Sequence, residues 1–129
     1  MRKLIQVLLL ISVFALLLSA CGTSSNPAAK AVENYLTALV EKNSDHLSAL
    51  SCASWESNAL LELNSLQAVK TRLDGLSCAV TGVDKTTTDV VCQGKIIATD
   101  NNEDQELDLT VRTYQVVQQG GKYLVCSYK

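Results

Sequence analysis

The residues of this chain that could do chemistry are mainly its cysteines. Five of them stand in the sequence, and their sulfur atoms could carry a lipid, pair as disulfides or bind a metal ion. Structural zinc sites draw cysteines separated by about two to four residues, and no two cysteines here have that spacing. We therefore expect lipid and disulfide chemistry and no metal site, with a four-cysteine zinc site as the alternative. The five positions are Cys21, Cys52, Cys78, Cys92 and Cys126.

Cys21 follows a segment that is typical of exported proteins. Arg2 and Lys3 precede an apolar run over residues 4–18. At ~1.5 Å per residue this run would span about 22 Å as a helix, which is short of the ~30 Å hydrocarbon core of a membrane. The segment therefore predicts a signal peptide over residues 1–20 and not a spanning helix.

The sequence Leu18-Ser19-Ala20-Cys21 resembles the lipobox of bacterial lipoproteins. The resemblance implies that the Cys21 sulfur receives a diacylglycerol, that the signal is removed before it, and that the new amino terminus is acylated, for example with palmitate. Residues 21–26 would then be the lipidated cysteine and a short tether. The expected location is extracytoplasmic, on the cell membrane or the outer membrane. An ordinary signal peptide with a chance cysteine is the alternative.

Few other side chains suggest catalysis. His46 is the only histidine, and the chain has no Gly-x-Ser-x-Gly elbow, phosphate loop, dinucleotide fingerprint or EF-hand spacing. The acidic run between Glu103 and Asp108 is expected to be a solvated hairpin, with weak calcium binding as the alternative. We therefore expect no cofactor, no metal and no enzymatic activity.

The charge and length of the exported part limit its partners. Two of the 11 basic residues belong to the leader, so nine basic and 13 acidic side chains remain. This acidic balance argues against binding to nucleic acid or to anionic lipid headgroups, so the expected membrane attachment is the N-terminal lipid. The remaining length suits one domain, over residues 27–129.

The apolar pattern predicts helices first and strands afterwards. Asn26-Pro27 would cap a helix that runs to about residue 42, and Asn43-Ser44-Asp45 would cap a second one. Two further short helices are expected within residues 52–73. From residue 76 on the period becomes two, which predicts four strands over residues 76–83, 87–100, 103–118 and 122–128.

The turns between these strands predict their register. Asn101-Asn102 and Gly120-Gly121 suit two-residue hairpin loops, so facing residue numbers should sum to 203 and to 241. A sum of 170 in the first hairpin would place Cys78 opposite Cys92. These registers gather most apolar side chains on one face, which the helices should cover. The opposite face would carry Gln93, Lys95, Asp108, Thr110 and Arg112.

The same registers select the disulfides. Cys92 and Cys126 would lie two strands apart, about 9 to 10 Å, which is too far for a disulfide with its Cα separation of about 5.5 Å. Cys78 and Cys126 would be farther apart still. Export favours oxidised cysteines, so we predict the pairs Cys78–Cys92 and Cys52–Cys126.

This architecture resembles the α+β cone of the nuclear transport factor 2-like families, which are cystatin-like. The resemblance implies N-terminal helices packed on a curved four-stranded antiparallel sheet, and envelope lipoproteins of unknown function carry such domains. It rests on the hairpin series from Leu76 on and on six residues of the helical half, namely Val32, Tyr35, Leu36, Leu39, Asp45 and Leu50.

Enzymes of that fold place acids, bases or histidines inside the cone. The inward sheet positions here offer only Thr113, Tyr128 and Gln115, so we expect a non-enzymatic binding or interaction domain. The alternative is a cone pocket that binds a small molecule or catalyses a reaction. An enzyme would require Glu56 or Glu62 to point into a cavity beside Tyr128.

An apolar patch is predicted on the outer face of the sheet. Exposed apolar surface that contains tyrosines often marks an interface. We therefore expect a homodimer or an envelope-protein partner at this patch, unless another segment covers it. Besides Ala79, its residues are Val91, Tyr114, Val116, Tyr123 and Val125.

Overall fold

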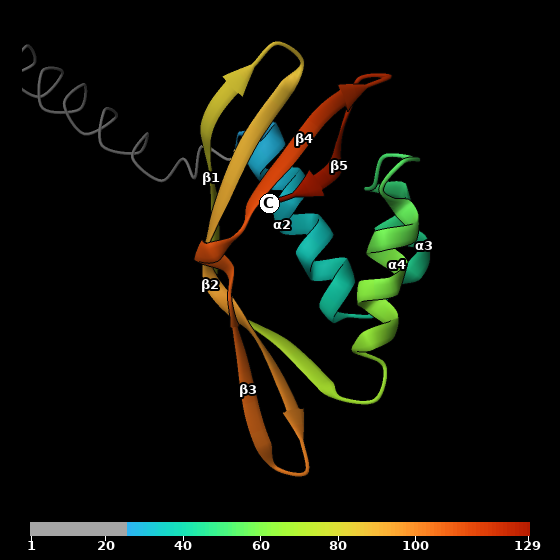
Figure 1. The fold of residues 1–129 in the computed structure, drawn as a ribbon, viewed down its shortest axis with the longest axis vertical. Coiled ribbons are helices and arrows are strands. Elements are labelled where there is room, and N and C mark those ends of the chain that lie inside the picture. The colour runs from blue at the N-terminus through green and yellow to red at the C-terminus, as the bar shows by residue number, and fades with distance from the viewer. Residues whose placement is uncertain (1–25) are drawn as a thin grey trace, which may run out of the picture.

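The computed structural model describes residues 26–129, and its helices come before its sheet, as predicted (Figure 1). The leader and Cys21 lie outside the described residues. Within residues 26–129, none of the helices is both long enough and apolar enough to span a membrane. The helices are α2 (Pro27–Val40), α3 (Ser44–Ala49) and α4 (Glu56–Ser65). The strands are β1 (Lys70–Asp84), β2 (Thr87–Asp100), β3 (Glu103–Asp108), β4 (Thr113–Gln119) and β5 (Lys122–Tyr128).

The first two helices begin where the capping residues predict. The Asn26 side chain accepts a hydrogen bond of 2.9 Å from the amide of Ala28, and Pro27 occupies the first turn, where its missing amide costs nothing. The Asn43 side chain accepts a 3.1 Å hydrogen bond from the amide of His46 at the start of α3. Short polar side chains therefore set both helix starts.

The region between residues 52 and 73 differs from the prediction. It contains one helix, α4, in place of two, and residues 70–73 already belong to β1. The long strand β2 explains the difference, because Lys70 pairs with Thr99 and Leu73 with Ile96. The backbone pairing with β2 outweighs the helical apolar spacing of this segment.

The sheet is antiparallel throughout, and β2 is its central strand. The order is β1-β2-β4-β5, and β3 also pairs with β2. One half of β2 pairs with β4 and the other half with β3, so both lie on the same side of β2. We call residues 95–108, the hairpin of β2 and β3, the arm; it projects away from the rest of the sheet (Figure 1).

The predicted registers are largely present. Lys95 lies opposite Asp108, which gives the sum of 203, and Gln119 lies opposite Lys122, which gives 241. Cys78 lies opposite Cys92, as expected. Irregularities shift the sum by one at both ends of the β1–β2 hairpin and near the end of β5.

The third predicted strand is broken, so the sheet has five strands in place of four. A 3₁₀ turn over Leu109–Val111 separates β3 from β4. The Asp108 carboxylate accepts from the amide of Thr110 at 2.9 Å and from its hydroxyl at 2.7 Å, and this stabilises the turn. The turn also reverses which side chains face inward: Leu109 is buried, Val111 is exposed and Tyr114 is buried.

The core lies between the helices and the concave face of the sheet (Figure 1). Helix α2 supplies Val32, Tyr35, Leu36 and Leu39, all fully buried. The sheet contributes further fully buried side chains from several strands, namely Val90, Cys92, Tyr114, Val116 and Val125. Two layers thus share one apolar core, and α4 lies over the side of the sheet from which the arm projects.

Candidate functional site

A cleft of about 690 Å³ lies between helix α4 and the arm. Its apolar lining comes from both sides, and a few polar side chains converge on it, which is the usual composition of a small-molecule site. Helix α4 and the preceding residue supply Trp55, Asn58, Leu61, Glu62 and Ser65, followed by Leu66. The sheet supplies Ile96, Ala98, Gln105, Glu106, Leu107, Arg112 and Tyr128.

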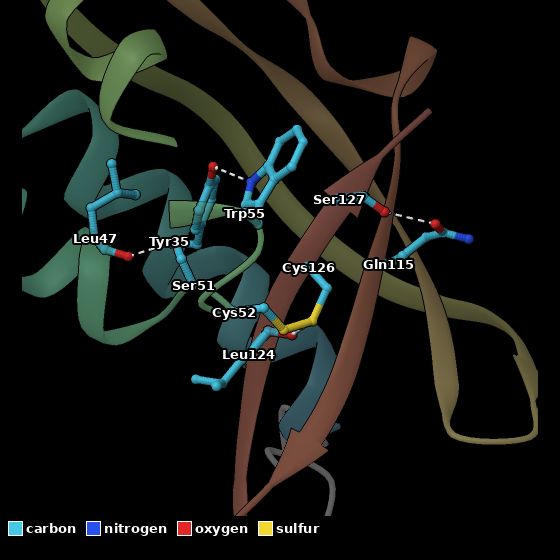
Figure 2. The surroundings of a disulfide bond; sticks show 9 residues. All are labelled: Tyr35, Leu47, Ser51, Cys52, Trp55, Gln115, Leu124, Cys126 and Ser127. Carbon is cyan, nitrogen blue, oxygen red and sulfur yellow. Dashed lines mark hydrogen bonds between the residues drawn. A yellow bond between two sulfur atoms is a disulfide. The ribbon is translucent and has the colours of Figure 1, made fainter. Parts of the chain in front are cut away.

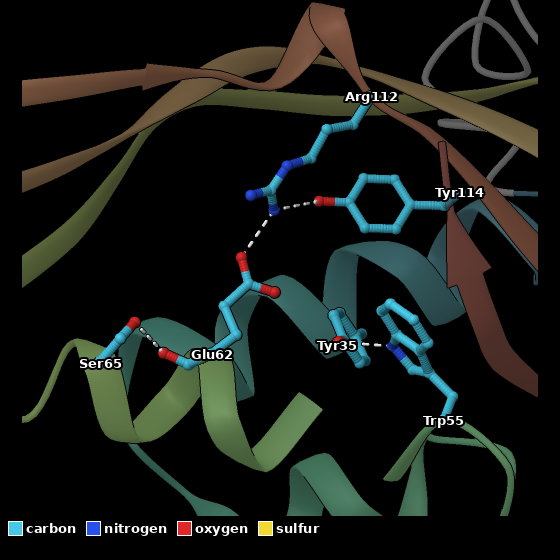
Figure 3. A network of polar contacts seen from close by, with 6 residues as sticks. All are labelled: Tyr35, Trp55, Glu62, Ser65, Arg112 and Tyr114. Atoms are coloured by element: carbon cyan, nitrogen blue, oxygen red, sulfur yellow. Dashed lines mark hydrogen bonds and ion pairs between the residues drawn. The ribbon is translucent and has the colours of Figure 1, made fainter. Parts of the chain in front are cut away.

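An ion pair crosses the inner end of this cleft (Figure 3). The Arg112 Nη1 atom donates to Glu62 Oε1 at 2.7 Å, and the two side chains are 15% and 16% exposed. Arg112 directly follows the 3₁₀ turn, and Glu62 lies in the middle of α4. The pair therefore joins the helical layer to the sheet in a largely desolvated place, where electrostatic interactions are stronger than in water.

Aromatic side chains surround the arginine. Its guanidinium carbon lies 4.2 Å from the centroid of the Tyr128 ring, a cation–π geometry, and Nη1 also donates to the Tyr114 hydroxyl at 3.4 Å. The Trp55 and Tyr128 rings meet edge to face with centroids 5.3 Å apart. The Trp55 indole N–H donates to the Tyr35 hydroxyl at 3.1 Å. These contacts fix the guanidinium in one position.

The environment of this network changes the proton affinity of its members. Burial raises the pKa of Tyr114 to about 12, and burial likewise raises the pKa of Tyr35. Burial acts to lower the pKa of Arg112, but hydrogen bonds with Tyr114 and Glu62 outweigh it, so the pKa is raised overall. At neutral pH the tyrosines are therefore neutral and the arginine is charged.

One oxygen of the network has no partner. Glu62 Oε2 is buried and accepts no hydrogen bond from residues 26–129. A buried acceptor without a donor is costly, and natural proteins keep few of them. Figure 3 shows this oxygen directed away from Arg112, toward the interior where Tyr35 and Trp55 lie.

Only some of the candidate residues predicted from the sequence line the cleft. The enzymatic alternative required either Glu56 or Glu62 in a cavity beside Tyr128, and Glu62 lines the cleft that also contains Tyr128, whereas Glu56 does not. His46 lies exposed on α3. Thr113 and Gln115 are partly buried but do not line the cleft, and the Gln115 side chain accepts from the Ser127 hydroxyl at 2.7 Å.

The prediction of an apolar patch on the outer face of the sheet is wrong for three of its residues, which are buried. Tyr114, Val116 and Val125 are fully buried in the core, while Val91 and Tyr123 are only partly exposed. The physical reason is the 3₁₀ turn, which shifts β4 by one residue. A shift of one residue exchanges the two faces of a strand.

The same turn explains why Arg112 was not recognised as a site residue. The prediction put it on the outer face, whereas it reaches into the cleft to Glu62. A sequence signal for the turn did exist, because an aspartate two residues before a threonine can form the side-chain turn seen at Asp108. The β-branched residues that follow Asp108 suggested a continuous strand instead.

Both predicted cysteine pairs lie at disulfide distance. Cys52 and Cys126 have Cα atoms 4.9 Å apart, and Cys78 and Cys92 have Cα atoms 4.0 Å apart. Figure 2 shows the first pair joining the segment before α4 to β5. Next to it, the amide of Cys52 donates to the carbonyl of Val125 at 2.8 Å. The link therefore holds Trp55 and α4 against the sheet, beside the cleft.

Comparison with known proteins identifies the fold and no closer relationship. No protein-family model matches the chain, and no curated protein matches its sequence. Among solved structures, Aln2 from a Streptomyces species is similar with a TM-score of 0.57 and 10% identity, over 79% of this chain and 85% of that chain. RPA3114 from Rhodopseudomonas palustris, a SEC-C motif containing protein, is similar with a TM-score of 0.53 and 10% identity, over 82% of this chain and 81% of that chain.

A third solved chain, Rd1NTF2_05 with five substitutions, has a TM-score of 0.48 and 14% identity, over 78% of this chain and 94% of that chain. The architecture is of the predicted α+β class, with N-terminal helices packed on a curved antiparallel sheet. At these identities the likeness describes the fold alone, and function has to be argued from the site.

Proposed function

We propose that this chain is a lipid-anchored, extracytoplasmic domain that binds a small, largely apolar molecule in the cleft between α4 and the arm. The observation that carries the proposal is the cleft of about 690 Å³ with an ion pair and aromatic rings at its inner end. Apolar walls with a few fixed polar groups are typical of ligand sites. The anchor rests on the lipobox-like sequence at Cys21.

Binding is favoured over catalysis by the state of Glu62. A general base has to reach the proton of its substrate, whereas Glu62 Oε1 is already bonded to a charged arginine at 2.7 Å and Glu62 Oε2 is buried. The Ser65 hydroxyl, which also lines the cleft, donates to the carbonyl of Glu62 at 2.6 Å and has no histidine beside it in the described cleft lining. The Glu62 carboxylate and the Ser65 hydroxyl are thus already engaged, one with Arg112 and one with the backbone, and neither is a free nucleophile in the described cleft lining.

Ligand binding in the cleft is tested with a dye titration and with a substitution that fills the cleft. The full chain in lipid nanodiscs is titrated with the neutral dye N-phenyl-1-naphthylamine, and the signal of empty nanodiscs is subtracted. We expect saturable binding that is lost in Ala98→Phe, because Ala98 lines the cleft. Ala79→Phe is the matched control, since Ala79 is an exposed strand residue that does not line it. Equal binding by both variants, or no saturable binding at all, would contradict the proposal.

The anchor is tested separately. Intact-mass measurement of the protein extracted from expressing cells should show the loss of residues 1–20 and the mass of acyl groups on residue 21. The Cys21→Ser variant should leave the membrane fraction. An unmodified Cys21 or a retained leader would remove the membrane-anchored part of the proposal and leave the cleft part standing.

A further inference from the structure

We propose that the cleft selects an uncharged apolar molecule through a hydrogen-bond acceptor, such as a carbonyl oxygen, that binds the unused edge of the Arg112 guanidinium. This inference rests on the proposed function, because it names the ligand class of the same cleft. It starts from the hydrogen-bond capacity of one side chain.

An arginine has five N–H donors, and Arg112 uses only one of its nitrogens. Both of its hydrogen bonds come from Nη1, one to Glu62 Oε1 and one to the Tyr114 hydroxyl. The Nε and Nη2 atoms donate to nothing within residues 26–129. Figure 3 shows the second terminal nitrogen turned away from both partners.

These unused donors retain access to solvent. Among the described residues, Glu62 Oε2 is the one completely buried side-chain nitrogen or oxygen that lacks a partner, so Nε and Nη2 of Arg112 are not completely buried. Arg112 lines the cleft and is 15% exposed. A molecule in the cleft can therefore reach this edge, whose side-by-side N–H groups are arranged to bind oxygen.

The Arg112 guanidinium is also already ordered before a ligand binds. Glu62, Tyr114 and the Tyr128 ring fix it from three directions. A donor that is already ordered loses little conformational entropy when it binds an acceptor, which raises affinity. The head group of the ligand must accept, because an arginine cannot accept a hydrogen bond.

The charges around the cleft favour a ligand whose hydrogen-bond acceptor is uncharged. The Glu62 carboxylate already balances the positive charge of Arg112, and Glu106 adds a second carboxylate to the lining. Glu106 is paired with Lys95, which stands outside the lining. A ligand carboxylate would thus share one arginine with Glu62, and a ligand ammonium would face the donor edge of Arg112. Like charges placed side by side oppose binding.

The apolar walls fix the rest of the molecule. Leu66 on the helical side faces a sheet side formed by Ile96, Ala98 and Leu107, with Trp55 and Tyr128 near the ion pair. A saturated or aromatic body would bury its surface between these walls while its carbonyl oxygen meets Arg112. The free energy gained by burial scales with the apolar area removed from water. The apolar part of the ligand would therefore supply most of the affinity, and its carbonyl group the selectivity.

Three probes with the same cyclohexyl body test this selection. They are cyclohexyl methyl ketone, cyclohexanecarboxylate and cyclohexylmethylammonium, which carry a neutral acceptor, an anionic acceptor and a cationic donor. Each is titrated into the full chain in nanodiscs, and binding is followed by the fluorescence of Trp55, the single tryptophan. We expect the ketone to bind about fivefold tighter than either ion, as one net hydrogen bond implies.

The Glu62→Gln variant provides the sharpest arm of the test. Glutamine can still accept from Arg112, but the arginine charge is no longer balanced. The carboxylate probe should gain about tenfold in affinity and become the tightest of the three. Asp104→Asn is the matched control, because Asp104 forms an exposed ion pair outside the cleft lining. It should leave the order of the probes unchanged.

The outcomes separate the two proposals. Equal binding of all three probes would overturn selection by Arg112 and leave cleft binding intact, whereas no binding of any probe would overturn both. Tighter binding of the carboxylate by the unaltered chain, or an unchanged order in Glu62→Gln, would also overturn the selection. The double variant Glu62→Leu with Arg112→Met removes both charges together, and it should bind the ketone and the carboxylate with reduced and similar affinities.

Discussion

At the scale of single residues, the chain concentrates its unusual chemistry in the contact between Glu62 and Arg112. Both side chains are mostly withdrawn from water, and each depends on the other for its charge balance. Removing one partner from such a pair is far more damaging than replacing both with apolar residues of similar size. The two residues therefore have to be replaced together if the stability of the fold is to be kept.

We predict that Arg112→Met lowers the free energy of unfolding by about 3 kcal/mol, because the Glu62 carboxylate then stays buried without a cation. The double variant Glu62→Leu with Arg112→Met should lose no more than about 1 kcal/mol, which urea denaturation can measure. Arg72→Met is the control: its ion pair with Asp104 is about half exposed, so the loss should stay below about 0.5 kcal/mol. Equal losses in the single and double variants would contradict the interpretation.

The buried tyrosines predict a decline in stability at high pH. The pKa of Tyr114 is raised to about 12 in the folded state, so the folded chain keeps a proton that the unfolded chain releases near pH 10. The stabilisation is complete below pH 10 and is lost as the pH rises toward 12, by up to about 1.4 kcal/mol per pH unit for each such tyrosine.

The burial of Tyr35 raises its pKa in the same direction, so two tyrosines contribute to this decline. Tyr114→Phe should therefore make the fall in unfolding free energy between pH 10 and 12 about half as steep. Denaturant titrations at several pH values in this window measure the slope. An unchanged slope in Tyr114→Phe would mean that this tyrosine ionises freely in the folded chain.

At the scale of elements, the chain shows which features a sequence can predict and which it cannot. The helix starts at Asn26 and Asn43 and most of the hairpin registers depend on a few residues with strong local preferences, and these predictions hold. Both predicted cysteine pairs lie at disulfide distance. The predicted faces of β4 fail because one 3₁₀ turn of three residues moves the strand by a single position. Alternation of apolar residues is preserved on both sides of such a turn, so the pattern alone gives no warning.

The β1 and β2 backbones approach closely next to the arm, at Gly94, and this approach predicts how an added methyl group there would affect stability. Gly94 has a φ of +95°, and a Cβ atom there would lie 2.5 Å from the carbonyl oxygen of Asp74. Gly94→Ala should therefore lower the free energy of unfolding by about 3 kcal/mol, through overpacking and backbone strain together. Gly82→Ala is the matched control in β1, because nothing lies within 4 Å of its added Cβ. Similar unfolding midpoints for the two variants would contradict this.

The two disulfides should differ in their contribution to stability. Cys52–Cys126 closes 74 residues and Cys78–Cys92 closes 14. In the chain-entropy account, replacing both cysteines of a pair by alanine should cost about 4 kcal/mol for the first and about 3 kcal/mol for the second. Denaturant unfolding of the two double variants gives the comparison. A larger loss for the Cys78–Cys92 pair would show that the loop length is not the deciding quantity.

At the scale of the whole molecule, the helical layer and the sheet are held together around the cleft by three different kinds of contact. The core packs α2 on the sheet, the disulfide ties the segment before α4 to β5, and the ion pair ties α4 itself to the residue after the 3₁₀ turn. The fold class followed from the switch of apolar period near residue 76. The cleft did not, because its helical and sheet residues are at least 30 residues apart in sequence and Arg112 reaches it through the break after Asp108.

The arm adds a mechanical consequence to this arrangement. Every sheet residue of the cleft from Ile96 to Leu107 lies beyond Gly94, on a hairpin whose strand β3 pairs with β2 alone among the described strands. The width of the cleft therefore depends on the backbone of β2 at Gly94 and on the pairing of residues 70–74 of β1 with the arm. Because Gly94 does not line the cleft, a change of backbone geometry there would alter the size of molecule the cleft admits while every lining side chain stays the same.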